Sequence, residues 1–410
     1  MNILINTKNV ISGFLTVFVY LYGSNEYLII KSKYGNVNCI NSENIVCLDT
    51  MPFSFISKTD RNKLELPFDD SISSSCIYVL YSKERLPIGY CRNIKTYVCK
   101  TGECLPIEVN IYWNMAGRYV GFELPSNEIL TKKDHIPFSK TDYKKLDRLL
   151  ANPQSVLGTY SIEDLVQSNG INDKRIDAIT SATVKVVNDV CVEGAVYTCY
   201  TLWHIANGQT ARFIAKRAVE AMTPEGGIYL IKYGDISDIS WLLNHVDIEE
   251  DKYRKLKVAL INKITPDNFF VTKHILDLLT DNDLNCISIQ TSLLNRFNIV
   301  HDYNIKARIL RKLVETENPD SSVLSYFEDR LLFFPVILQV EIISLLGKMN
   351  QVSIKAIQQV KSLIENDNKF LTNKALEFLG KHNELQKRSK ADKATKEEEL
   401  LHNQVKRDNN

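Results

Sequence analysis

The second half of the chain repeats one pattern of apolar and polar positions. From about residue 211 to 381, segments of about ten to fifteen residues carry leucine or isoleucine at helical spacing. They recur about every seventeen residues, so a pair of segments repeats near thirty-five. Short polar joints such as TPDN, TDND, ENPD and ENDN separate them. The pattern predicts stacked helix pairs forming a solenoid, and a plain helical bundle is the alternative. The segments are ISDISWLLNHV, YRKLKVALINKI, FFVTKHILDLLT, CISIQTSLLNRF, NIKARILRKLVET, VLSYFEDRLLFF, VILQVEIISLLGKM, IKAIQQVKSLIEN and LTNKALEFLGKH.

The first half has the shorter apolar runs that are typical of strands. From Cys76 onward, CIYVLYS, the run through IKTYVC, PIEVNIYWNMAG and RYVGFEL predict an antiparallel sheet, and WNMAGRY has the Asn and Gly of a turn. TDYKKLDRLLA predicts a helix, with Ser139 or Thr141 as its cap. NPQSVLG then breaks the chain before a short helical piece, SIEDLV.

The N-terminal residues allow two interpretations. Lys8 precedes about fifteen mostly apolar residues that end near Gly23 and Ser24, which is the length of a signal-peptide core. The alternative is a buried first strand. Residues 25–75 then alternate β-like runs, EYLIIKS and NIVCLDT, with Asn, Ser and Asp breakers. We therefore expect a signal peptide over 1–24 and a β-rich segment over 25–75.

Charge and composition exclude few classes of function or partner. The chain of 410 residues has 50 basic and 49 acidic side chains, so no overall positive field recommends nucleic acid as a partner. The residues from 383 onward are nearly all charged or polar, and we expect a disordered tail there. The remainder divides into a mixed region over 76–208 and the helical region over 211–382.

One short stretch, DAITSAT at residues 177–183, carries more hydroxyl groups than a helix cap needs. It precedes VKVVNDVCVEGAVYTCYTLWHIANG, which has the apolar periodicity of one long helix. A helix N-terminus favours an anion such as a phosphate, because free N–H groups and the helix dipole meet there. A capped helix that binds nothing is the structural alternative.

The stretch RIDAITSATVKVVNDVCVEGA resembles the signature of the FMN-binding domain found in the C subunit of the sodium-pumping NADH:quinone reductase and the G subunit of the Rnf electron-transport complex. The family pattern is Asp, two variable residues, Ser or Thr, Gly or Ser, Ala, and Thr or Ser. The flanking sequences, from GYCRNIK to FELP and GAVYTCYTLWHIANG, resemble bacterial members of this family, especially those of Bacteroidota. The resemblance spans about residues 88 to 208. The positions that match the pattern are Asp177, Thr180, Ser181, Ala182 and Thr183.

The resemblance implies an α+β domain with FMN joined to Thr183 through a phosphoester bond that a separate flavin transferase makes. Small Ala182 leaves room for the flavin to approach, and Asp177 would fix the loop or assist the metal of the transferase. Two positions differ from the residues most common in the family. Ser181 replaces the commoner glycine, and Lys185 stands where many members carry a small hydroxylated residue.

The expected fold is therefore an α+β FMN-binding domain followed by an all-α, HEAT-like helical solenoid. The expected function is electron transfer by an exported flavoprotein, periplasmic or membrane-associated, with the solenoid offering a surface to a redox partner protein or a membrane electron-transport complex. Two alternatives remain: a cofactor-free helical scaffold, and a flavin-dependent reductase with its own small substrate. No catalytic residue is predicted.

Cysteines and aromatic residues suggest weaker candidates. Cys91, Cys99 and Cys104 lie close in sequence, so one disulfide is feasible in an exported chain, and buried thiols are the alternative. Zinc would need a fourth ligand, and His135 is the nearest histidine. Packing is sufficient to explain Cys191 and Cys199 on one face of the predicted long helix. Several aromatic side chains fit either a flavin pocket or the core: Tyr112, Trp113, Tyr119, Phe122 and Trp203, together with His204.

Overall fold

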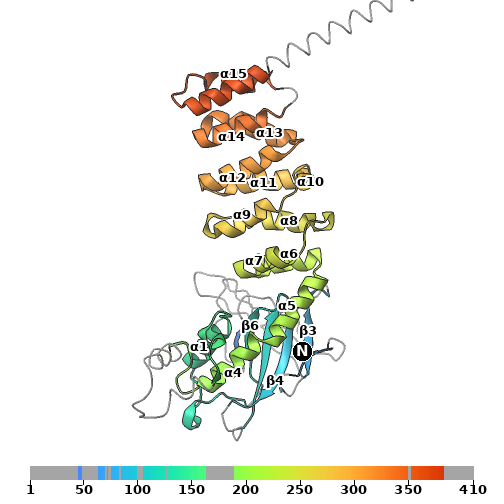
Figure 1. The fold of residues 1–410 in the computed structure, drawn as a ribbon, viewed down its shortest axis with the longest axis vertical. Coiled ribbons are helices and arrows are strands. Elements are labelled where there is room, and N and C mark those ends of the chain that lie inside the picture. Colours follow the sequence, from blue (N-terminus) through green and yellow to red (C-terminus); the bar gives the residue numbers. More distant parts are fainter. Residues whose placement is uncertain are drawn as a thin grey trace, which may run out of the picture. The chain divides into compact units, whose positions relative to one another are not determined.

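The computed structural model divides into two compact units, Met1–Val246 and Asp247–Asn410 (Figure 1). It describes residues 45–48, 63–69, 72, 75–82, 85–98, 105–125, 128–162, 189–349 and 352–382. The first unit holds a β-sheet with helices, and the described part of the second is helical. The expected combination of an α+β domain with a helical region is therefore confirmed.

A six-stranded antiparallel sheet forms the centre of the first unit, in the order β1-β6-β5-β4-β3-β2. The four strands predicted from Cys76 onward are confirmed, and two shorter strands lie before them, within the segment expected to be β-rich. The run EYLIIKS lies outside the described residues. The strands are β1 (Ile45–Leu48), β2 (Lys63–Glu65), β3 (Cys76–Tyr81), β4 (Pro87–Thr96), β5 (Ile107–Asn114) and β6 (Tyr119–Glu123).

The predicted turn between β5 and β6 is also confirmed. The side-chain oxygen of Asn114 accepts hydrogen bonds from the backbone N–H groups of Ala116 and Arg118, both at 3.0 Å. Gly117 adopts φ +81°, a left-handed conformation that favours glycine. The turn sequence therefore provides both the side-chain acceptor and the flexible residue that a tight connection needs.

One face of the sheet carries the larger core. Strands β4 and β5 pair from Gly89↔Asn114 to Thr96↔Ile107, so alternate side chains point to opposite faces. Val109, Ile111 and Trp113 are fully buried in one cluster with residues of α1 (Lys140–Leu150) and α4 (Val196–Ala206). The two helices also pack against each other. This layer of helix on sheet positions the cavity described below.

The opposite face has a smaller, more polar core. Leu80, Ile88, Cys91, Tyr112 and Val120 form its apolar cluster, against which Tyr229 and Tyr233 pack. These two tyrosines belong to α6 (Pro224–Tyr233), which follows α5 (Gln209–Ala221). The Tyr112 hydroxyl donates a hydrogen bond of 2.6 Å to the buried Glu123 carboxylate, and burial raises the pKa of this tyrosine well above its usual range.

An ion-pair network holds the following helix, α7 (Ile236–His245), to the turn after β5. Asp238 is 1% exposed and accepts hydrogen bonds of 2.6 Å each from Asn114 and from the Nη2 atom of Arg118. A buried carboxylate needs such partners, because removing it from water is costly. The helical segments after residue 208 thus begin within the first unit.

Helix α1 begins as its sequence predicts. Ser139 accepts a hydrogen bond from the Asp142 N–H, and the Asp142 carboxylate accepts one from the Ser139 N–H. Of the two candidate caps, the structure therefore uses Ser139. Leu146, Leu149 and Leu150 are buried on the face that the periodicity identified.

The prediction of one long helix after DAITSAT is wrong, because the described part of this segment is interrupted before α4. Residues 189–190 are helical, residues 191–195 are not, and α4 begins at Val196. Gly194 adopts φ +73°, and the Val192 N–H donates to the sulfur of Cys199 at 3.3 Å instead of continuing a helix. The apolar residues continue through this break, so periodicity alone does not reveal it.

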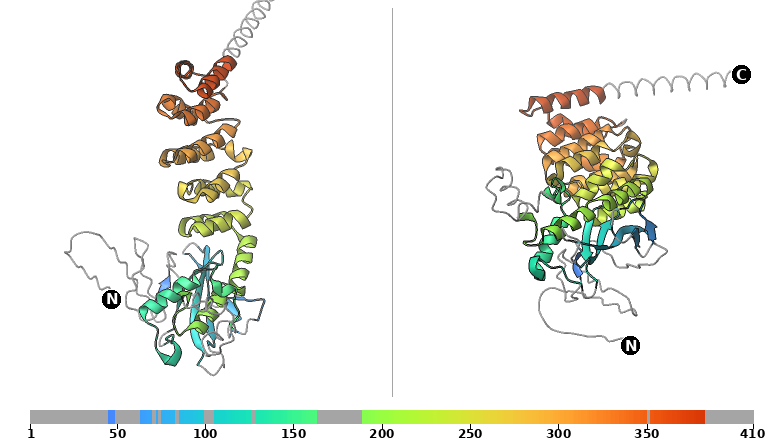
Figure 2. Two further views of the ribbon diagram at one scale, coloured as in Figure 1. Left: turned by 60° about the vertical axis from the view of Figure 1, so that its left-hand side comes forward. Right: turned by 60° about the horizontal axis from the view of Figure 1, so that its bottom comes forward.

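The second unit is built from pairs of helices in successive layers (Figures 1 and 2). The predicted helical segments from YRKLKVALINKI onward are confirmed, and residues 369–382 form the last described helix. The others are α8 (Arg254–Ile261), α9 (Phe269–Asp277), α10 (Asp281–Leu284), α11 (Ile287–Ile299), α12 (Tyr303–Glu315), α13 (Ser321–Arg330), α14 (Val336–Leu346) and α15 (Ile354–Ser362).

Basic side chains connect equivalent helix ends in successive layers. Arg296 donates to the carbonyl of Ile264 at 2.5 Å, and Lys348 donates to that of Thr316 at 3.0 Å. Both bonds join residues separated by 32 positions. Thr316 is the C-cap residue of α12, and Ile264 lies in the connection that follows α8. Carbonyls at or just beyond a helix C-terminus lack a partner within the helix, so a cation satisfies them well.

A buried ion pair joins the first two layers. Lys257 and Asp283 are 0% and 1% exposed, and the lysine lies 2.8 and 2.7 Å from the two carboxylate oxygens. Lys257 also donates to the carbonyl of Glu249 at 2.9 Å. The charges therefore compensate each other in a site from which water is excluded.

Candidate functional site

The residues predicted to carry FMN lie outside the described part of the chain. These are Asp177, Thr180, Ser181, Ala182 and Thr183, with Lys185 after them. Their arrangement stays a prediction from sequence. The described residues nearest to them in the chain are Ile162 and Asp189, the second of which leads into α4.

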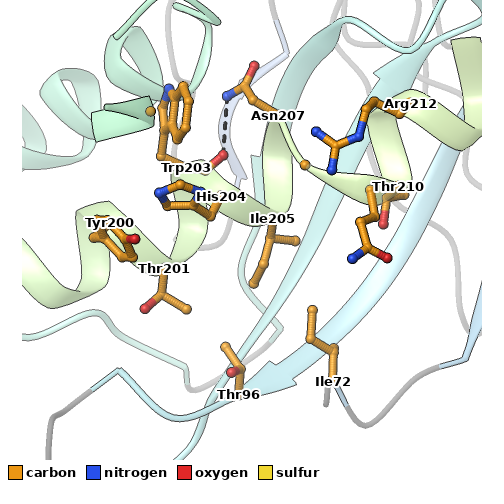
Figure 3. A pocket seen from close by; sticks show the side chains of 13 residues that line it. Ile72, Thr96, Tyr200, Thr201, Trp203, His204, Ile205, Asn207, Thr210 and Arg212 are labelled. Carbon is orange, nitrogen blue, oxygen red and sulfur yellow. Dashed lines mark hydrogen bonds between the residues drawn. The ribbon is translucent and has the colours of Figure 1, made fainter. Parts of the chain in front are cut away.

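A cavity of about 510 Å³ lies in the first unit where α4 meets α5 (Figure 3). Its volume falls within the range of cofactor and small-molecule sites. Most of its wall comes from the end of α4 and the first turn of α5, and the rest comes from β4, the 3-10 helix Val156–Gly158 and the loop that holds Ile72. The lining residues are Ile72, Thr96, Gly158, Tyr200, Thr201, Trp203, His204, Ile205, Asn207, Gly208, Gln209, Thr210 and Arg212.

Three ring systems on α4 form one side of this cavity. The His204 imidazole lies between Tyr200 and Trp203 in Figure 3, with ring centroids 4.2 Å and 4.9 Å away. Two backbone carbonyls fix the rings: the Trp203 indole donates to Asn152 at 2.8 Å, and Nε2 of His204 donates to Leu157 at 3.1 Å. The wall is therefore aromatic and held in place, with the imidazole inclined by 49° to the Tyr200 ring and by 87° to the Trp203 ring.

The protonation of His204 follows from its surroundings. Burial lowers the pKa of this imidazole, and the hydrogen bond to Leu157 opposes the effect only in part. The ring is consequently neutral near pH 7, with the proton on Nε2 because a carbonyl can only accept. Nδ1 is then a hydrogen-bond acceptor.

Gly208 separates α4 from α5 and shapes the opposite side. A Cβ atom on this residue would lie 2.0 Å from the carbonyl oxygen of His204, so only glycine fits without displacing backbone. Gly208 is also the N-cap residue of α5, so this position has no side chain to cap the first turn. Arg212 projects from that turn into the cavity wall in Figure 3. An exposed guanidinium beside a helix N-terminus suits an anionic group.

Side chains from the sheet hydrogen-bond to the junction between α4 and α5. Trp113 of β5 donates its indole N–H to the carbonyl of Ala206 at 2.7 Å, and Arg92 of β4 donates to the Thr210 hydroxyl at 2.9 Å. Arg92 and Trp113 are fully buried. Asn207 donates to the carbonyls of Leu150 and Trp203, at 3.1 and 3.3 Å. The cavity wall is therefore preorganised by bonds to three neighbouring elements.

The sequence indicated part of this site. Trp203 and His204, considered as either core or flavin-facing residues, line the cavity, and Trp203 is also buried. Among the described lining residues, none of the sheet aromatics Tyr112, Trp113, Tyr119 and Phe122 appears, because they pack in the two cores. Sequence reasoning missed Tyr200, Thr201, Gln209, Thr210 and Arg212. The Asn-Gly pair at 207–208 was the available signal of a helix break.

The cysteine and metal candidates gain little support. Cys91 is buried in the smaller core, and Cys99 and Cys104 lie outside the described residues. His135 is exposed, and the described ranges contain no group of three or more His, Cys, Asp or Glu side chains placed to hold a metal ion.

Comparison with known proteins identifies no relative. No family model, curated protein or solved structure matches the chain. Within the described ranges, none of the helices combines the length and apolar character needed to cross a membrane.

Proposed function

We propose that the first unit is an FMN-binding domain and that the protein acts in electron transfer, with FMN joined to Thr183. The observation that carries this proposal is the cavity at the α4–α5 junction. One side is aromatic, and the other offers Arg212 beside a helix N-terminus whose N-cap residue is glycine. FMN has an aromatic ring system and an anionic phosphate, so its two ends suit the two sides. When bound, FMN supplies one- and two-electron chemistry.

The described residues would position such a ligand rather than react with it. Tyr200, Trp203 and His204 provide ring faces, and Thr201, Gln209 and Thr210 provide hydrogen-bonding groups. The signature residues Asp177, Thr180, Ser181 and Ala182 would shape the loop that presents Thr183, and a flavin transferase would make the bond. The proposed location is extracytoplasmic, periplasmic or membrane-associated.

The helical unit is proposed to be a HEAT-like solenoid that offers a surface to a redox partner protein or a membrane complex. Several hydrogen bonds between successive layers join residues 30 to 34 positions apart, close to the repeat length in the sequence. A regular spacing of this kind supports stacked equivalent pairs over an irregular bundle. A cofactor-free scaffold is the second candidate function, supported by the same bonds.

Intact-mass measurement tests the covalent cofactor. The full chain is co-expressed with a flavin transferase in an exporting host, beside its Thr183→Val and Thr159→Val variants. Thr159 is an exposed threonine whose hydroxyl donates to the Val156 carbonyl, and it serves as the matched control. We expect the mass of FMN less one water on the native chain and on Thr159→Val, and no addition on Thr183→Val. An unmodified native chain beside a flavinylated control protein would favour the scaffold.

A second measurement tests the cavity separately. FMN added to the Thr183→Val protein should bind without a covalent bond, and its fluorescence should be quenched by the aromatic wall. Arg212→Gln should weaken this binding by about tenfold, since a charge-assisted contact is lost. Lys216→Gln changes an exposed cation one turn further along α5 and should leave the affinity unchanged. Equal affinities for both variants would place FMN elsewhere.

A further inference from the structure

Two thiols from different segments meet inside the larger core. Cys191 lies in the bend before α4, and Cys199 lies within α4. Both are 0% exposed and belong to one cluster of buried residues. The break at residues 191–195 folds the chain back, so that the Val192 N–H reaches the Cys199 sulfur at 3.3 Å. Cys191 is thereby brought beside Cys199.

The backbone places the two side chains next to each other, because Cys191 directly precedes Val192, whose N–H donates to the Cys199 sulfur. An interaction between the two thiols lowers the pKa of Cys199 and raises that of Cys191. Two neighbouring thiols of this kind can be joined by thiol–disulfide exchange, in which a thiolate attacks a disulfide.

Three other cysteines whose side chains the structure describes lie elsewhere. Cys91 belongs to the smaller cluster on the other face of the sheet, Cys76 begins β3, and Cys286 lies in the second unit. Cys191 and Cys199, by contrast, belong to the same buried cluster of the larger core.

We propose that Cys191 and Cys199 form a disulfide bond when the chain matures in the presence of a disulfide oxidant. The Cys199 thiolate attacks the oxidant's disulfide, which releases one thiol and leaves a mixed disulfide. The Cys191 sulfur then displaces the second thiol, and its proton passes to that thiol. Two cysteine thiols are oxidised to one disulfide, and one oxidant disulfide is reduced to two thiols. The oxidant is a small-molecule disulfide or a disulfide oxidoreductase.

The disulfide would be a covalent cross-link at the start of α4. It would join the chain after the predicted attachment segment to the helix that carries Tyr200, Trp203 and His204. The bond forms before the core closes, because both sulfurs are inaccessible afterwards. This inference holds whether or not the chain carries FMN.

The test compares the full chain produced in a reducing cytosol and in an oxidising cytosol that contains a disulfide isomerase. Each sample is acid-quenched, alkylated under denaturing conditions and digested without reductant. We expect a cross-linked Cys191–Cys199 peptide pair, two mass units lighter than the sum of its thiol forms, in the oxidised sample alone. Folded oxidised protein in which both cysteines carry the alkyl label would overturn the proposal.

Two variants complete the test. Cys286→Ser changes a thiol in the second unit and should keep the cross-link. Cys191→Ser should lose it and leave Cys199 open to alkylation. Thermal unfolding of the native chain should occur at higher temperature for the oxidised sample than for the reduced sample. A cross-link from Cys199 to a different cysteine in the folded native chain would also refute the pairing.

Discussion

The guanidinium of Arg92 donates a hydrogen bond of 2.9 Å to the hydroxyl of Thr210, and this bond joins residues 118 positions apart. It links the middle of β4 to the first turn of α5, where the candidate cavity lies. Both side chains are buried, at 0% and 2% exposure. The helix junction is therefore fixed to the sheet by a charged group held away from water.

Replacing Thr210 with valine should destabilise the first unit. The change keeps the side-chain shape but removes an acceptor from a buried charged donor, which costs about 1–3 kcal/mol in the free energy of unfolding. Thr210→Ser keeps the hydroxyl and should cost less. Urea unfolding followed by tryptophan fluorescence measures this unit, since all three tryptophans, Trp113, Trp203 and Trp241, belong to it. Equal losses for valine and serine would show that the hydrogen bond is unimportant.

Gly208→Ala should destabilise the same unit more strongly. The added Cβ would meet the His204 carbonyl oxygen at 2.0 Å, so backbone must move, at a cost of about 2–4 kcal/mol. The midpoint of thermal unfolding should fall by roughly 2–4 °C for each kcal/mol. Gly380→Ala is the control, because a Cβ there would meet nothing within 4 Å. An unchanged tryptophan-monitored transition in Gly208→Ala would contradict the geometry.

His204 should make the stability of the first unit depend on pH. Burial lowers the pKa of this imidazole in the folded state, so the unfolded chain binds its proton more readily. The free energy of unfolding should therefore fall as pH decreases through the ordinary histidine pKa of 6.5 towards the lower folded value. His204→Gln should flatten this part of the profile. His245→Gln, which changes an exposed histidine of α7, should leave it intact.

Lys257→Met should destabilise the second unit. The substitution leaves the Asp283 carboxylate buried without its cation, and breaking such a pair costs about 3–5 kcal/mol. Lys257→Met with Asp283→Asn should recover part of the loss, because asparagine removes the charge and can still cap at Thr280. Lys255→Met, an exposed lysine of the same helix, is the control. Unfolding of the helical unit is followed by circular dichroism. If the double variant were no more stable than Lys257→Met, the loss would not have an electrostatic cause.

Local pattern predicted much of the architecture. Short apolar runs between turn residues marked β3 to β6, because the central strands are buried on both faces. Helical spacing marked α7, α8, α9 and α11 to α15. The cap at Ser139 was also readable, since a capping box needs only neighbouring residues. The break at 191–195 was not readable, because its apolar residues fit a helix equally well.

The candidate cavity depends on contacts that local pattern does not encode. Thr96 and Arg212 line one space although they lie far apart in the chain. From the sequence alone, Arg92 is a polar residue within a predicted strand. Its burial beside Thr210, to which it donates a hydrogen bond, is visible only in the structure. For the DAITSAT residues the sequence suggests a role, and they lie outside the described part of the structure. Their predicted role comes from resemblance, and it stays a prediction.

The bonds from Arg296 to Ile264 and from Lys348 to Thr316 have a consequence for how this chain can change length. Both span 32 residues, which is about one helix pair. Duplication of a whole pair copies the basic donor together with the carbonyl acceptor, so every layer retains its neighbour's bond. Insertion of one residue within a pair rotates the donor away from its acceptor by about a quarter of a turn. The helical unit therefore accommodates growth by complete pairs and resists growth by single residues.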